Sequence, residues 1–237
     1  MRDRDWGKAK KFREGQAVQT LDDLFFVFLD TVEKLQPKVV VAENVVGLLK
    51  GKARGYVNEI VKRFRALGYD VQIFSLNSAY MDVPQARHRA FFVANRCGFE
   101  KLKLNFDHTP IRFEEVRSEH GEPLSKNARI TRALLEAATE KDKRLLDVSK
   151  RISGEDGKYY GQIIVHDKQV CPTITSGGIF YRMADKMRMS DVDLRNVQSF
   201  PQDYDFAGNS VQYVCGMSVP PNMMANVATE VYEQWLK

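Results

Sequence analysis

The chain has 237 residues, of which 36 are Lys or Arg and 31 are Asp or Glu, so its formal net charge is +5. A hydrophobic fraction of 43% with 28% charged residues is typical of folded proteins and excludes disordered and low-complexity classes. No apolar run reaches the roughly 18 residues that a membrane span needs, and no apolar signal region follows the charged start. We therefore expect a cytoplasmic protein with no membrane partner.

The three cysteines, Cys97, Cys171 and Cys215, are widely separated and form no C-x-x-C pair, so we expect neither a disulfide framework nor a structural zinc site. The four histidines are also scattered, and we expect no metal. The mild positive charge is compatible with a nucleic-acid partner but does not establish one.

The first predicted elements are a basic arm and an amphipathic helix. Residues 1–19 are polar and basic and read as a loop or arm. Apolar residues then recur at spacings of three and four up to Pro37, which predicts a helix with Thr20 and Asp23 as a capping box. These apolar positions are Leu21, Leu24, Phe25, Phe28, Val32 and Leu35.

The next segments alternate between strand and helix patterns. Residues 39–42 form a continuous apolar run, typical of a strand covered on both faces. A second helix, ending at Gly68, is predicted from the spacing of Val57, Ile60, Val61, Phe64 and Leu67. Extended segments follow at residues 71–76 and 90–94, separated by a loop with Pro84. The alternation predicts an open α/β sheet.

The pattern of apolar and polar residues changes after residue 96. Residues 97–187 contain short apolar clusters, one predicted helix over 127–148, and glycine-rich turns at 154–157 and 176–178. We interpret this segment as a smaller, irregular second domain. Residues 1–96 and 188–237 are then the parts of the main α/β domain, with a closing helix predicted over 223–236.

Two short segments are candidate sites. Glu43 directly follows a predicted strand, and ligands of open α/β sheets bind outside the carboxyl ends of strands. The alternative is that Glu43 caps the turn or pairs with a nearby arginine. Arg87 and Arg89 stand two residues apart in an extended segment, so both guanidinium groups could reach one ligand. The alternative there is a solvated basic edge.

Together, these segments resemble the cytosine-C5 DNA methyltransferase family. Glu43-Asn44-Val45 is similar to its Glu-Asn-Val motif, and Gln85-Ala86-Arg87-His88-Arg89 to its Gln-x-Arg-x-Arg motif. Leu67-Gly68-Tyr69 lies between them, and Leu24-Phe25-Phe26 matches the residues that precede the first. The resemblance continues in Pro172-Thr173-Ile174-Thr175, in Asn196-Val197-Gln198-Ser199-Phe200-Pro201 and in Gly216-Met217-Ser218-Val219-Pro220-Pro221.

The resemblance implies part of a Rossmann-like methyltransferase sheet, with its front strands missing, and a target-recognition domain over residues 97–187. The implied activity is that of a DNA (cytosine-5)-methyltransferase, which transfers a methyl group from S-adenosylmethionine to a cytosine flipped out of double-stranded DNA. DNA methylation of this kind occurs in restriction-modification systems.

The resemblance also implies roles for individual residues. Glu43 is the acid that hydrogen-bonds N3 and the exocyclic amine of cytosine, where it relieves negative charge in the ring. Arg89 contacts O2, and Arg87 buttresses the site or a phosphate. The implied substrate-binding residues are Asn44, which also organises the turn, Val45 and Gln85. The implied cofactor-binding residues are Ser218 and, more weakly, Leu24.

Two family motifs do not occur in the chain. There is no glycine-rich Phe-x-Gly-x-Gly loop for the cofactor, and no Pro-Cys loop for the nucleophile, since no cysteine precedes Cys97. We therefore expect the chain to be inactive without a partner chain or N-terminal segment that carries both loops. Met217 also departs from the family's usual asparagine, which lines the cofactor pocket.

Two further interpretations remain open. The chain is alternatively an inactive DNA-binding remnant, or it acts on tRNA, as one branch of the family does. In the middle region, Gly177 and Gly178 could let the backbone approach DNA, and three basic residues could meet phosphates or form a solvated face. These are Arg182, Lys186 and Arg188.

Overall fold

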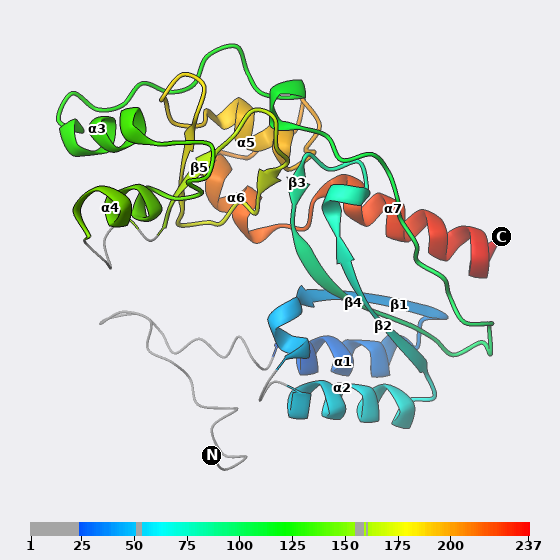
Figure 1. Cartoon of the computed structure of the whole chain (residues 1–237). Helices are drawn as coiled ribbons and strands as arrows, with labels where there is room; N and C mark the ends of the chain where they lie inside the picture. Colours follow the sequence, from blue (N-terminus) through cyan, green and yellow to red (C-terminus); the bar gives the residue numbers. More distant parts are fainter. Residues whose placement is uncertain (1–23, 51–53, 155–158, 160) are drawn as a thin grey trace. The chain divides into compact units, whose positions relative to one another are not determined.

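The structure, a computed structural model, describes residues 24–50, 54–154, 159 and 161–237. Figure 1 shows the chain, which divides into two compact units. Unit 1 consists of residues 1–76 and 88–103, and unit 2 of residues 77–87 and 104–237. The predicted arm and the capping residues Thr20 and Asp23 lie outside the described residues. Within the described ranges, no helix is both long enough and apolar enough to cross a membrane.

Unit 1 is a sheet with two helices on one face. Its strands run in the order β1, β4, β2, and β1 pairs antiparallel with β4. Figure 1 shows α1 and α2 next to each other beneath this sheet. The bounds are α1 Leu24–Leu35, β1 Val39–Val45, η3 Val46–Leu49, α2 Arg54–Ala66, β2 Asp70–Asn77 and β4 His88–Asn95.

Both helices of unit 1 confirm the predicted helices, although the buried stripe of α1 is shifted. Its buried residues are Phe25, Leu29 and Val32, while Leu24 is 58% exposed. In α2, the buried residues include Ile60 and Phe64, both predicted. These side chains and those of β4 form one core, which therefore holds the helices against the sheet.

The most deeply buried strand is β4, and this corrects the expectation for residues 39–42. All five residues from Ala90 to Ala94 are 0% exposed, whereas Val40 is the one buried residue of β1. The physical reason is position, because β4 has a strand on each side. Among the described strands, β1 is paired on one side alone.

In its described residues, unit 2 contains two small parallel sheets and five α-helices. β3 pairs with β6, and β5 pairs with β7. The strand bounds are β3 Gln85–Ala86, β5 Gln162–Val165, β6 Cys171–Pro172 and β7 Ile179–Arg182. The helix bounds are η5 Ser78–Tyr80, η6 Phe113–Glu115, α3 Arg129–Ala137, α4 Leu145–Ser153, α5 Asp191–Val197, α6 Val211–Met217 and α7 Pro221–Val231, with a π-helical end, η7 Tyr232–Leu236.

The single helix predicted over 127–148 is wrong, because two helices, α3 and α4, occupy this region. The carboxylate of Asp142 accepts hydrogen bonds from the backbone N–H and the hydroxyl of Thr139, both at 2.8 Å. Asp147 accepts one from the backbone N–H of Arg144 at 2.9 Å, in the first turn of α4. Local side-chain bonds of this kind compete with the helix and end it between the two segments.

The C-terminal part of the chain packs within unit 2. One core contains Phe113 and Ile174 together with Leu194, Val197 and Cys215. Residues 104–187 of the predicted recognition domain thus share a core with residues 188–237. The assignment of 188–237 to the catalytic domain stays a prediction.

Candidate functional site

Glu43 and Arg89 form an ion pair across two neighbouring strands of unit 1. In the β1–β4 register, Glu43 lies opposite Phe91 and Val45 lies opposite Arg89, so the two side chains are diagonal neighbours on one face. Arg89 Nε lies 2.7 Å from Glu43 Oε1, and the two side chains are 14% and 23% exposed. The arginine that the sequence analysis considered as a partner of Glu43 is therefore the other candidate residue.

The Glu43–Arg89 pair is partly shielded from solvent. Burial lowers the pKa of Arg89, and the Glu43 carboxylate opposes this by favouring the charged guanidinium. Arg89 also donates from Nη1 to the carbonyl of His88 at 2.8 Å. A guanidinium held in this way, with its carboxylate still partly exposed, can meet a polar ligand.

Asn44 organises the end of β1. Its Oδ1 accepts a hydrogen bond from the backbone N–H of Val45 at 2.8 Å, just before the chain enters η3. The Val45 side chain is exposed. This bond agrees with the predicted turn role of Asn44.

Arg87 has entirely different partners from Arg89. It is 1% exposed and donates to three backbone carbonyls, those of Ile174 at 2.7 Å, Gly216 at 2.8 Å and Ser218 at 2.9 Å. The expectation that both guanidinium groups reach one ligand is not met. Arg87 lies in the break between β3 and β4, so the alternation of one continuous strand does not apply. The guanidinium buttresses protein segments and does not face a phosphate.

Gln85 belongs to the same network. Its amide donates to Gln198 Oε1 at 2.5 Å and accepts from the backbone N–H of Ile174 at 3.0 Å. Gln198 in turn donates to Ser218 Oγ at 3.2 Å, and the hydroxyl of Thr173 donates to the carbonyl of Ala86 at 2.6 Å. The segments 85–87, 172–175, 196–201 and 216–221, far apart in sequence, are thus joined in unit 2. Gln198 belongs to the 196–201 motif, but its role in this network was not predicted.

The two cofactor candidates lie in different units, Ser218 in unit 2 and Leu24 in unit 1. The hydroxyl of Ser218 accepts from Gln198 and donates to the carbonyl of Cys215 at 3.3 Å, so protein groups already engage it. Leu24 and Met217 are exposed. A cofactor role for Ser218 or Leu24 therefore stays a proposal.

Two of the three cysteines, Cys171 and Cys215, lie in surroundings that make a thiol unreactive. Burial raises the pKa of Cys171, and it raises the pKa of Cys215 to about 12, which disfavours the nucleophilic thiolate. Cys97, by contrast, is exposed in the bend after β4.

The basic residues of the middle region separate into two kinds. Arg182 is 0% exposed and pairs with Asp185 at 2.8 Å and Asp193 at 3.3 Å, so it fits neither of the two readings, phosphate contact or a solvated face. Arg188 is exposed. Across the described ranges, no group of three or more His, Cys, Asp or Glu side chains could hold a metal ion.

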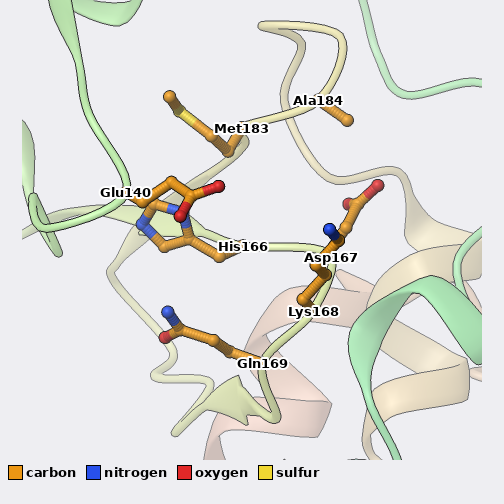
Figure 2. Close-up of a pocket in the computed structure, with 7 residues that line it drawn as sticks. All are labelled: Glu140, His166, Asp167, Lys168, Gln169, Met183 and Ala184. Atoms are coloured by element: carbon orange, nitrogen blue, oxygen red, sulfur yellow. The ribbon is translucent and has the colours of Figure 1, made fainter.

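Unit 2 also contains a hollow of about 240 Å³ at the carboxyl ends of β5 and β7 (Figure 2). His166 is nearly buried there, with Nε2 at 2.8 Å from the carbonyl of Asp142. None of the predicted site residues lines this hollow. Its lining residues are Glu140, His166, Asp167, Lys168, Gln169, Met183 and Ala184.

Comparison with known proteins gives a consistent result. The family model described as C-5 cytosine-specific DNA methylase matches residues 5–233. Type II methyltransferase M1.HphI of Haemophilus parahaemolyticus is 30% identical over 88% of this chain and 60% of its own length. M.NgoFVII of Neisseria gonorrhoeae is 28% identical over 88% of this chain and 62% of its own. The chain thus spans about three fifths of these relatives.

A solved structure shows the same fold. The Entamoeba histolytica methyltransferase EhMeth superposes with a TM-score of 0.63 over 91% of this chain and 69% of its own, at 12% identity. The α/β fold expected from the sequence is therefore confirmed as that of the methyltransferase structures.

Proposed function

The chain belongs to the C-5 cytosine-specific DNA methylase family, and on that premise we propose that it supplies the acid and the recognition surface for methyl transfer to cytosine C5 in double-stranded DNA. The observation that carries this proposal is the ion pair of Glu43 and Arg89 on adjacent strands. The names of the relatives favour a restriction-modification setting.

The chemistry explains why a carboxyl group and a guanidinium group are needed together. Attack of a thiolate on C6 puts negative charge into the cytosine ring, and C5 then becomes nucleophilic. Once its carboxylate has taken up a proton, Glu43 leaves its ion pair with Arg89 and donates to N3, and Arg89 donates to O2, so both stabilise that charge. The 2.7 Å contact between them keeps the two groups ready to face one base.

The thiolate and the cofactor loop come from outside the described site. The 237 residues contain no Pro-Cys dipeptide, and the surroundings of Cys171 and Cys215 disfavour a thiolate. S-adenosylmethionine supplies the methyl group when it is bound. We propose that a further polypeptide segment carries both loops and that methyl transfer depends on it.

The DNA-contacting surface is proposed to include the turn at residues 175–178. Thr175, Ser176 and Gly177 are exposed, and a Cβ on Gly177 would meet no atom within 4 Å. Hydroxyl and backbone N–H groups of this kind commonly contact DNA phosphates. The turn directly follows Ile174, whose backbone is held by Gln85 and Arg87.

The test combines this chain with a family polypeptide that carries the Phe-x-Gly-x-Gly and Pro-Cys loops. Incorporation of labelled methyl groups into duplex DNA, lost on Glu43→Gln, is the expected result. Incorporation into tRNA and not DNA would favour the tRNA alternative. DNA binding without transfer, with both polypeptides folded, would favour the inactive remnant and contradict the proposal.

A further inference from the structure

Gln212 holds the exposed turn of residues 175–178 from the first turn of α6. Its Nε2 donates to the carbonyl of Thr175 at 3.3 Å and also to the carbonyl of Gly178. One side-chain amide therefore binds both ends of the turn. The sequence analysis did not single out this residue.

The same face of α6 approaches the turn a second time. Gly216 lies four residues after Gln212, hence on the same side of the helix. A Cβ on Gly216 would lie 2.1 Å from the backbone nitrogen of Ser176. The helix thus touches the middle of the turn as well as its ends.

The start of the turn is held independently. Ile174 receives a hydrogen bond from Arg87 on its carbonyl and donates one to Gln85 from its N–H. These bonds fix the residue before the turn, and the Gln212 amide, together with the turn's own bond from the Gly178 N–H to the Thr175 carbonyl, holds residues 175–178. The exposed surface of the turn is then held in a single conformation.

We propose that Gln212 is a positioning residue for DNA binding, whose amide holds the turn of residues 175–178 in the shape that meets the phosphodiester backbone. This inference rests on the proposed function, which supplies the DNA. Without the amide, the turn samples other shapes, and apparent affinity falls by the fraction that is competent to bind. If one molecule in ten is competent, the dissociation constant rises about tenfold.

The test measures binding of the chain to a fluorescently labelled DNA duplex of mixed sequence by anisotropy, at several salt concentrations. Gln212→Met keeps the size of the side chain and removes the donor. We expect it to raise the dissociation constant about tenfold, with an unchanged salt slope, since the bound form contacts the same phosphates. Gln169→Met is the matched control, because Gln169 is an exposed glutamine of the same unit whose side chain makes no hydrogen bond to the described residues.

A second variant keeps the inference testable if Gln212→Met does not fold. Gln212→Glu places a carboxylate against two carbonyl oxygens, and protonation gives back one donor. Its binding, relative to the wild-type chain at the same pH, should recover as the pH falls toward about 5. A residue that matters for folding alone would not show this reversal.

The outcomes separate the inference from the proposed function. Gln212→Met and Gln169→Met with the affinity of the wild-type chain would overturn the role of Gln212 and leave DNA as the substrate. A wild-type chain with no salt-sensitive DNA binding would overturn both. A tenfold loss in Gln212→Met alone is the supporting result.

Discussion

Arg87 and Arg89 stand two residues apart in one motif, but they lie in different units and have opposite surroundings. In unit 2, Arg87 is buried against three backbone carbonyls. In unit 1, Arg89 faces a carboxylate that is still partly exposed. Carbonyl dipoles can be satisfied without any ligand, whereas a partly exposed carboxylate and guanidinium can still take a ligand. The comparison thus separates a residue that holds the fold from one that we propose to meet the substrate.

The largest effect is expected from a variant that breaks the Glu43–Arg89 ion pair in unit 1. Glu43→Gln cannot protonate N3, so methyl transfer by the chain with its complementing polypeptide should fall by about 10²-fold or more. Thermal unfolding should change little, because the amide can still accept from Arg89. Glu59→Gln, an exposed residue of α2 in the same unit, is the control and should retain activity.

The next effect compares the loss of each arginine, Arg87 and Arg89, on replacement by methionine. Arg87→Met removes the Arg87 donor from the carbonyls of Ile174 and Gly216, and leaves that of Ser218 with Gln198 alone, so it should lower the free energy of unfolding by about 3–5 kcal/mol. Arg89→Met loses one partly exposed ion pair and should cost about 1 kcal/mol. Urea denaturation of both variants measures the difference. Equal losses would contradict the division of roles between the two residues.

A smaller effect tests the contact between α6 and the turn. Gly216→Ala places a methyl group 2.1 Å from the backbone nitrogen of Ser176, so the helix must shift, at a cost of about 1–3 kcal/mol. Gly177→Ala adds the same group where no atom lies within 4 Å, and its effect should stay within about 0.5 kcal/mol. Similar thermal unfolding of the two variants would argue against a close contact.

The smallest effect returns to unit 1 and concerns Asn44. Asn44→Ala removes the acceptor for the N–H of Val45 and should cost about 1 kcal/mol of stability. If Asn44 only organises the turn, methyl transfer should fall less than about tenfold, far less than for Glu43→Gln. A loss as large as that of Glu43→Gln would instead place Asn44 at the reacting base.

Much of unit 1 could be predicted from local pattern. The spacing of Ile60 and Phe64 predicted α2. The apolar run predicted β1, but the strand continues to Val45, so Glu43 lies within β1 and does not follow it. Burial was harder to predict. Residues 39–42 and residues 90–94 are both apolar runs, and only the strand order makes the second one central.

Unit 2 was harder to predict, because polar side chains determine where its helices end and which of its segments meet. Asp142 and Asp147 interrupt a segment whose apolar spacing reads as one helix. Gln198 lies in a motif that gives it no role, and Gln212 lies in no motif. A glutamine is ordinarily a surface residue. Their roles follow from what lies opposite them in space.

The order of short motifs by itself determined the family and pointed to Glu43 and Arg89. Such motifs are readable because each keeps its residues within a few positions of one another. The tertiary structure alone decided that Arg87 is a buried buttress, through bonds to residues 87 and 129 positions away. Whether an arginine meets a ligand or a carbonyl depends on which distant segments surround it, and local sequence does not encode that directly.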